Sequence, residues 1–293
     1  SVASRKTKRN AMKKEESKVI AQKLQKIPNG TLALKHCRAG GTGTTLFGEQ
    51  FRAVTAGKEG VMEAYETFPG IEVSFNVFLA SEVKFRHDAS DSVLEIYYCR
   101  SGRVGWNMQG GTAVYLGAGD VTAHSMACCA DSAMMLPLGY SEGISISVDL
   151  KQLSSICPEV LKNAGVEADQ LRDRFCSGKP SAIPSCSDLE HIFAPLFSAP
   201  VSVRISLLKL KVLEILIYLS NMKSEHKELT QYFSQQTELI KEIHQQLTEH
   251  LDQRFTIAEL SKQYLINTST LKEIFKAVYG QPIATYMKEF RVR

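Results

Sequence analysis

The chain has 293 residues, of which 44% are hydrophobic and 23% charged, and its formal net charge at pH 7 is +4. This length allows about two domains of an ordinary globular protein. Its seven cysteines form no repeated C-x-x-C pair, and an odd count without a signal peptide predicts reduced thiols and a cytoplasmic protein.

The charge is unevenly distributed along the chain. Residues 1–27 hold nine Lys/Arg and two Glu, whereas residues 235–293 hold eight Lys/Arg and seven Asp/Glu. The C-terminal region is therefore nearly neutral. A function in nucleic-acid binding cannot be argued from its bulk charge.

Residues 1–45 are expected to form a basic tail and a loop. A weak amphipathic turn runs through Ile20, Leu24 and Ile27. A basic arm can contact phosphate, although a solvated tail is the favoured interpretation. The Gly-rich run 39–43 lacks the Gly-Lys-Ser/Thr ending of a phosphate-binding loop, so we interpret it as a flexible loop.

Residues 46–150 are expected to form a barrel or sandwich, because short apolar runs alternate there with glycine-containing turns. The expected strands are 71–79, 93–100, 103–108, 112–116, 120–124, 132–136 and 143–149. Two stretches in this region, Leu-Glu-Ile-Tyr-Tyr-Cys-Arg-Ser-Gly at 94–102 and Tyr-Leu-Gly-Ala-Gly-Asp-Val at 115–121, are similar to the cupin-like sensor half of many AraC-type regulators. Gly117 and Gly119 would let the chain bend, and Asp120 is expected to bond nearby turn amides.

No catalytic residues, cofactor or metal site are expected in this barrel. His87, Glu95 and His124 only partly resemble the metal site of enzymatic cupins, because Asp88-Ala89 follows His87 and the His-x-His pair is missing. The adjacent Cys128 and Cys129 are poor chelators, since neighbours on a strand point to opposite faces. A thiol sensor stays a less favoured alternative.

A small-molecule effector would bind inside the barrel if some interior positions stay unfilled. The candidates are aromatic or soft side chains near the strands, and any one of them is as well explained as core. They are Tyr97, Trp106, Met108, Tyr115 and Met134.

From residue 151 the pattern becomes helical, and 151–222 is expected to be a connecting and dimerisation region. Residues 201–219 are densely apolar. Arg204, Lys209, Lys211 and Glu214 interrupt them, which argues against a membrane span. A long helix that packs on the barrel and on a second subunit is the favoured interpretation. The polar residues 223–234 are expected to be a linker.

Residues 256–279 predict a helix-turn-helix. Apolar residues recur at helical spacing on both sides of a break at 265–267, and Asn267, Thr268 or Ser269 can cap the second helix. Gly280 is placed to end that helix in a left-handed C-cap, and Pro282 suits the start of another. A pair of short helices alone is as consistent with plain packing as with DNA binding.

The string Thr-Ile-x-Glu-Leu-Ser, followed by Asn-Thr-Ser-Thr-Leu-Lys-x-Ile-Phe-Lys-x-x-Tyr-Gly-x-Pro-Ile-x-x-Tyr-Met, resembles the first helix-turn-helix of AraC/XylS transcriptional regulators over residues 235–293. The resemblance implies a domain with two such motifs, so the expectation is a chain truncated before the second. The family often has Gly at the turn position held by Leu265. A left-handed backbone costs a residue other than glycine roughly 1–2 kcal/mol, so we expect the turn to differ slightly there; alternatively, Leu265 covers the small core.

The resemblance implies which residues meet DNA. Ser269, Lys272 and Glu273 would face the bases, since Lys can donate to guanine and Glu can accept from cytosine. The residues expected to flank the bases or contact phosphate are Thr256, Lys262, Thr268, Thr270, Lys276, Lys288 and Arg291.

The sequence thus predicts an α+β chain: a cupin-like sensor barrel, a helical connector and the first half of an AraC-type DNA-binding domain. Its expected function is ligand-responsive, sequence-specific transcription regulation, as a homodimer on double-stranded DNA. One alternative is a metal-dependent cupin enzyme with a helical appendage, which stoichiometric metal in the purified protein would favour. Another is a protein-interaction module that does not bind DNA.

Overall fold

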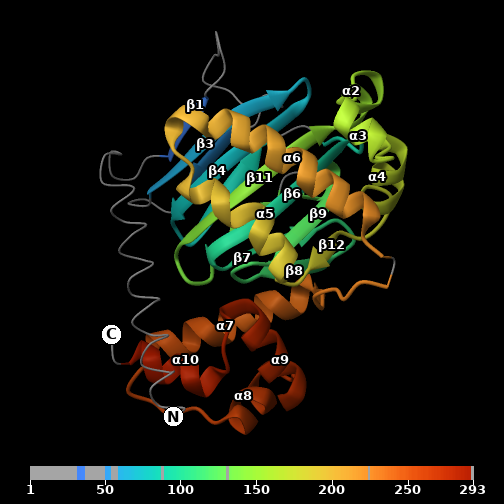
Figure 1. Cartoon of the computed structure of the whole chain (residues 1–293). Coiled ribbons are helices and arrows are strands. Elements are labelled where there is room, and N and C mark those ends of the chain that lie inside the picture. Colours follow the sequence, from blue (N-terminus) through green and yellow to red (C-terminus); the bar gives the residue numbers. More distant parts are fainter. Residues whose placement is uncertain are drawn as a thin grey trace.

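The structure, a computed structural model, describes residues 32–36, 50–53, 59–86, 89–129, 132–223 and 225–291. A strand-rich part covered by helices is followed by an all-helical part beside it (Figure 1). This confirms the predicted fold class, a cupin-like barrel with a helical connector and a C-terminal helix-turn-helix. The expectations for the basic tail 1–31 and the Gly-rich run 39–43 lie outside the described residues.

The barrel is made of two sheets. The first sheet contains, in spatial order, β1 (Leu32–His36), β3 (Glu59–Phe68), β4 (Ile71–Leu79), β11 (Ser141–Asp149), β6 (Val93–Gly102), β9 (Val121–Ser125) and β12 (Ser181–Ile183). The second contains β13 (Tyr232–Phe233), β8 (Thr112–Leu116), β7 (Val104–Met108), β10 (Ala133–Met135), β5 (Glu82–Arg86) and β2 (Gln50–Ala53).

All seven predicted strands are present, with ends shifted by no more than two residues. The structure adds β1 within the region expected to be tail and loop, where it pairs in parallel with β3. It also adds β12 and β13 from the regions expected to be connector and linker. The sheets therefore draw on chain from both sides of the predicted barrel.

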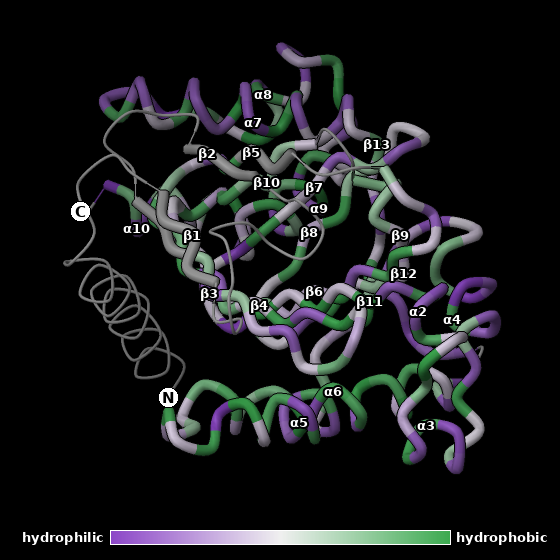
Figure 2. Tube along the Cα trace, turned by 90° about the horizontal axis from the view of Figure 1, so that it is seen from above, coloured by the Kyte–Doolittle hydropathy of each residue, from purple (hydrophilic) through white to green (hydrophobic). Residues whose placement is uncertain are grey.

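Helices cover the outer face of the first sheet (Figures 1 and 2). They are α2 (Leu150–Ser155), α3 (Glu159–Asn163), α4 (Ala168–Phe175), α5 (Ser187–Ser198) and α6 (Arg204–Asn221). Apolar residues of the strands, such as Ile96 and Ile146, form one buried cluster with Leu208 and Leu216 of α6. Each such side chain contributes roughly 1.5–3 kcal/mol when fully buried. Among the described helices, none is both long and apolar enough to cross a membrane.

The C-terminal part consists of α7 (Ser234–Glu249), α8 (Ile257–Gln263), α9 (Thr268–Tyr279) and α10 (Ile283–Phe290). Its core continues into the second sheet, because Ala113, Tyr115 and Met135 belong to the same buried cluster as the helix residues. The predicted linker is also tied down: Leu229 N donates to Ala182 O at 2.7 Å, and Tyr232 pairs with Ala113 of β8. The two parts therefore share an interface as well as a connection.

Candidate DNA-binding surface and sensor interior

The first helix of the pair, α8, starts at a capping box. Thr256 Oγ1 accepts from Glu259 N at 3.1 Å, and the Glu259 carboxylate accepts from Thr256 N at 2.7 Å. These bonds satisfy backbone donors that a helix start leaves unpaired. The Thr256 hydroxyl, predicted to contact phosphate, also donates to the Glu259 carboxylate at 2.9 Å, so its main contacts are within the cap.

The turn between α8 and α9 keeps a left-handed residue at Leu265, so the expectation that the turn differs because of the missing glycine is wrong. Leu265 has φ +52°, the one positive φ among the described residues other than glycine. Its side chain is 93% exposed, so the expectation that it covers the core is wrong. Ile266 is the buried residue of the turn instead. The backbone O of Ser261 accepts from Ile266 N, and the Ser261 hydroxyl donates to Ile266 O.

Helix α9 is closed at both ends by the predicted residues. Asn267 Oδ1 accepts from Ser269 N at 2.8 Å, and Gly280, at φ +79°, ends the helix in the left-handed region. Leu271, Ile274 and Val278 are buried on its inner face. A helix with fixed ends and one fully buried face presents its other face in one orientation.

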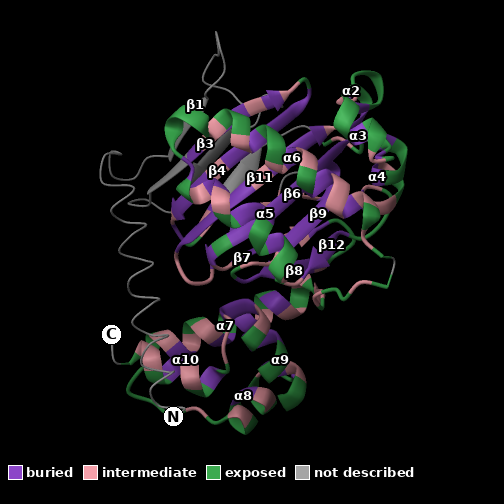
Figure 3. Cartoon of the chain, in the orientation of Figure 1, coloured by how far each residue is buried: buried purple, intermediate pink, exposed green. Residues whose placement is uncertain are grey.

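The predicted base-facing residues Ser269, Lys272 and Glu273 are all exposed. They belong to α9, which carries exposed stretches in Figure 3. Glu273 differs from the other two because its carboxylate accepts from Tyr232 Oη at 3.1 Å. Burial first, and then the Glu273 carboxylate, raise the pKa of Tyr232 to about 12, so the phenol stays a donor. The geometry thus places Glu273 at the edge of α9 that meets the barrel.

The predicted flanking residues differ in how exposed they are and in whether they have partners within the protein. Lys262, Thr268, Lys276 and Lys288 are exposed, and Thr270 is half-buried. Arg291 is exposed but donates to Gln253 O at 2.8 Å, so one of its donors is used within the protein.

An aromatic cluster behind α9 was missed by the sequence reasoning. His244 of α7 stacks on Tyr279, with ring centroids 4.2 Å apart, and is hydrogen-bonded through Nε2 to Tyr286 Oη at 2.8 Å. Burial lowers the pKa of His244 to about 4, so the ring is neutral at neutral pH. Nothing local in the sequence links His244 to Tyr286.

The five side chains proposed for the effector pocket do not form one group. Tyr97, Trp106, Met108 and Met134 lie in one buried cluster between the sheets, and the rings of Tyr97 and Trp106 are 5.1 Å apart. Tyr115 packs instead among the C-terminal helices, with its hydroxyl 3.6 Å from Met135 Sδ. It therefore belongs to the interface between the two parts.

The interior face of the first sheet is polar, which the sequence reasoning also missed. A continuous row of partners in the strand register runs Glu66, Glu72, Ser147, Glu95 and His124 across five strands. Their apolar sequence neighbours face the helices, so the row faces the second sheet. Ser147 Oγ donates to Glu95 Oε1. Polar and apolar residues alternate along these strands, and this alternation in the sequence could have predicted the polar interior face.

Of the residues considered for metal or thiol chemistry, Glu95, His124, Cys128 and Cys129 lie in the described part of the chain. Glu95 and His124 are neighbours across β6 and β9, and His87 lies outside the described residues. Within the described part, no group of three or more His, Cys, Asp or Glu is arranged to hold a metal ion. Cys128 and Cys129 lie in a 3₁₀ turn, η1 (Met126–Cys129), so the strand geometry used to argue against chelation does not apply to them.

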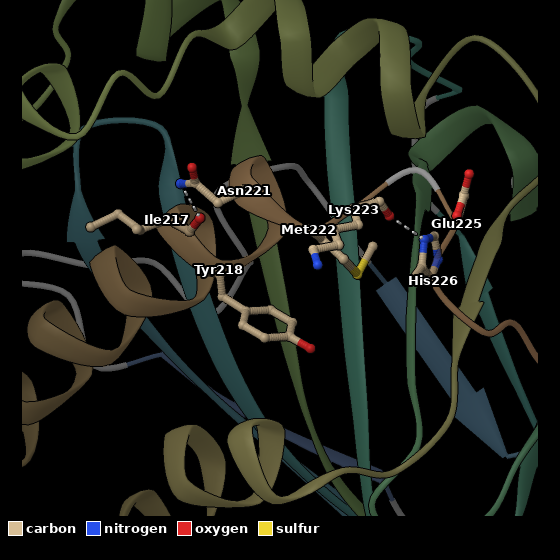
Figure 4. A pocket seen from close by; sticks show the side chains of 7 residues that line it. All are labelled: Ile217, Tyr218, Asn221, Met222, Lys223, Glu225 and His226. Atoms are coloured by element: carbon tan, nitrogen blue, oxygen red, sulfur yellow. Dashed lines mark hydrogen bonds between the residues drawn. The ribbon is translucent and has the colours of Figure 1, made fainter.

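A surface pocket of about 480 Å³ lies where α6 ends and the connection to the helical part begins (Figure 4). It is lined by Ile217, Tyr218, Asn221, Met222, Lys223, Glu225 and His226. The pocket is outside the barrel, and long side chains such as Lys223 and Met222 form part of its wall. None of the predicted effector-site residues lines it.

Comparison with known proteins gives structural neighbours only. No family model matches the sequence, and no curated protein matches it either. The AraC-like transcriptional activator CuxR is similar with a TM-score of 0.38 and 12% identity over 83% of this chain and 85% of CuxR. Unsaturated fatty acid-bound ToxT from Vibrio cholerae gives 0.36 and 10% over 78% and 80%.

A cupin 2 conserved barrel domain protein from Salinispora arenicola is also similar, with a TM-score of 0.26 and 17% identity over 32% of this chain and 79% of that protein. The structural neighbours are thus AraC-like activators and cupin barrels. Because all three TM-scores lie below 0.5, the case for function has to come from this chain's own residues.

Proposed function

We propose that this chain is a ligand-responsive, sequence-specific DNA-binding regulator of transcription and not an enzyme. The observation that carries the proposal is α9. Both of its ends are capped, one face is buried, and Ser269, Lys272 and Lys276 are exposed along the opposite face. A second helix held in this way after a tight turn is shaped to enter a major groove, where residues near its N-terminus meet the bases.

Lys272 is the residue best placed to read a base, because its ammonium can donate to guanine O6 or N7. Ser269 lies one turn nearer the helix start. Lys262, Lys276 and Lys288 supply charge for phosphates on either side and fix the register. We assign Glu273 to the contact with Tyr232 rather than to a base.

The barrel would be the sensor. Its interior offers carboxylates, hydroxyls and an imidazole in one row, beside the apolar cluster around Tyr97 and Trp106. An effector with polar groups and a small apolar body would suit such an interior better than a purely aliphatic one.

The experiment that tests DNA binding is selection of duplexes from a random pool by the full chain. For Lys272→Ala we expect the affinity for the selected duplex to fall about tenfold, because a good base contact contributes about 1–3 kcal/mol of discrimination. The affinity for a scrambled duplex should fall much less, and binding is measured by fluorescence anisotropy at fixed salt.

The matched control is Lys162→Ala, which removes an equally exposed lysine on α3, far from α9 in the fold. It should bind both duplexes like the wild type. If Lys272→Ala leaves both affinities unchanged, the protein-interaction module becomes the better interpretation. If the wild-type chain enriches no sequence at all, sequence-specific regulation by this helix pair is ruled out.

A further inference from the structure

One side chain of the barrel reaches the end of the recognition helix. Arg103 lies on the hairpin between β6 and β7, and its Nε donates to Val278 O at 3.0 Å while Nη2 donates to Ala277 O. These partners lie in the last turn of α9. The barrel is thus bonded directly to the helix that carries the proposed reading residues.

Arg103 provides hydrogen-bond donors to the C-terminal end of α9. The last carbonyls of a helix have no partner within the helix, and the end carries partial negative charge. The Gly280 cap satisfies Lys276 O only, through Gly280 N at 2.8 Å. Arg103 therefore binds the next two carbonyls with charge-assisted bonds, and its planar guanidinium fixes direction as well as distance.

The guanidinium lies in a slot that two glycines make possible. A Cβ at Gly117, in the turn before β9, would lie 2.7 Å from Arg103 Nη1, and a Cβ at Gly280 would lie 2.9 Å from Arg103 Cδ. Asp120 borders the slot and is held there, since its carboxylate accepts from Gly117 N and Ser185 N. It offers negative charge near the half-buried guanidinium.

The barrel holds one side of α9 and leaves the reading side exposed. Glu273, bound by Tyr232, and Ala277, bound by Arg103, are one turn apart on the same side of the helix. Ser269, Lys272 and Lys276 stay exposed on the adjacent side. Docking of this kind orients the helix without covering its N-terminal half.

The same strand connects this contact with the barrel interior. β6 places Glu95 and Tyr97 on the interior face and ends at Gly102, directly before Arg103. Gly102 has φ +79°, and a Cβ there would lie 2.3 Å from Tyr140 O, so this hairpin turn is tightly determined. A change in the interior that shifts β6 would therefore move Arg103.

We propose that Arg103 is a positioning residue that fixes recognition helix α9 against the barrel, so that the β6–β7 hairpin sets how α9 meets DNA. This deepens the proposed function and rests on it. The docking itself is independent of DNA, and it can be tested separately from the function.

The docking test is hydrogen exchange, read by mass spectrometry on the full chain. Arg103→Ala should raise exchange roughly fivefold in peptides covering residues 276–282 and β13, because a segment opens more often once the bonds that hold it are removed. The first sheet should be unchanged. Arg172→Ala, which removes an arginine paired with Asp169 on α4, is the control and should match the wild type.

Arg103→Lys keeps the charge but cannot bind two carbonyls in a fixed geometry. Its exchange at residues 276–282 should therefore lie between that of the wild type and that of Arg103→Ala. If Arg103→Ala unfolds the chain, exchange rises in the first sheet too, and the lysine variant then decides. Wild-type exchange at residues 276–282 in a folded Arg103→Ala protein, or in Arg103→Lys when the alanine variant is unfolded, would overturn the docking.

The functional test uses the duplex selected by the wild-type chain and its scrambled version. In Arg103→Ala we expect the ratio of the two affinities to fall about tenfold, because a misoriented helix gives up base recognition before phosphate binding. The scrambled duplex should bind within about twofold of wild type, since no α9 charge is changed. Arg172→Ala should keep the full ratio.

The outcomes separate the two proposals. An unchanged ratio in a variant whose exchange shows α9 released would overturn the positioning role while leaving DNA binding intact. If the wild-type chain selects no duplex, the proposed function fails and the DNA-orienting role fails with it. The exchange result would still decide whether Arg103 docks the helix.

Discussion

Leu265 holds a backbone conformation that is costly for any residue with a Cβ. Its φ of +52° lies in the left-handed region, which costs roughly 1–2 kcal/mol for a residue other than glycine. Its side chain is 93% exposed and loses no packing when removed. We therefore expect Leu265→Gly to raise the free energy of opening of α8 and α9 by about 0.5–1 kcal/mol, after the entropy cost of glycine in the unfolded chain.

Native-state hydrogen exchange of the buried amides of α9, at several urea concentrations, measures this free energy. Leu265→Ala is the control, because it removes the same exposed side chain but keeps the Cβ. It should give the wild-type value within about 0.5 kcal/mol. Equal stabilisation by both variants would mean that the exposed side chain, and not the backbone, is the source of the cost.

At this scale the sequence was informative where the determinant is local. Asn267 and Gly280 cap α9 as predicted, because capping depends on the residue type at one position and on its immediate neighbours. Arg103 and Tyr232 were not predicted as contacts of α9. Their partners lie 174 and 41 residues away, and no periodicity or motif encodes a contact over such separations.

At the scale of elements, His244 ties α7 to α9 and α10 only while it is neutral. Its pKa is lowered from 6.5 to about 4 by burial, so protonation favours the unfolded helices. In the unfolded chain the ring takes a proton as the pH falls through 6.5, whereas in the folded chain it does so only near 4. The stability that the neutral His244 ring contributes is therefore fully present above about pH 6.5, and it is lost progressively between about pH 6.5 and 4.

We expect this loss to be on the order of 2 kcal/mol at pH 4, allowing for partial exposure of the ring. The comparison that isolates it is His244→Phe, which can still stack on Tyr279 but does not titrate. Exchange of α9 amides at pH 7 and pH 5 should show a smaller loss on acidification in this variant than in the wild type. The same pH dependence in both proteins would assign the acid sensitivity to other groups.

The strands show which patterns a sequence reveals. β4 and β8 have the predicted bounds, since apolar runs between glycine-rich turns define them. β3 was missed because it carries Glu59, Glu63 and Glu66 at spacings that match neither a buried run nor strict alternation. The structure explains this mixture: Glu63 pairs with Arg204 on the helix side, while Glu66 joins the interior row.

For the whole molecule, the sequence predicted the order of the parts but not how they join. The C-terminal helices share a core with the second sheet, and β13 adds a strand to it. The interface between the barrel and the C-terminal helices is formed by residues such as Tyr115 and Met135. In the sequence their pattern is that of ordinary barrel core. Tyr115 was therefore proposed for the effector pocket, although it lies where the barrel meets the C-terminal helices.

We expect two copies of the chain to form a dimer through the outer side of α6. Apolar side chains are exposed there and in the preceding turn, η2 (Val201–Val203): Val201 is 79%, Val203 50% and Leu210 63% exposed. Two copies that pack along this side would bury these residues and place two reading helices on one DNA.

Leu210→Glu should then shift the protein from dimer to monomer in sedimentation equilibrium, weakening association at least about tenfold, because a carboxylate without a partner would be buried in the interface. Ile156→Glu is the matched control, since Ile156 is 60% exposed and follows α2 rather than belonging to α6. It should leave the dimer intact. A monomeric wild type, or equal loss of dimer in both variants, would contradict assembly through α6.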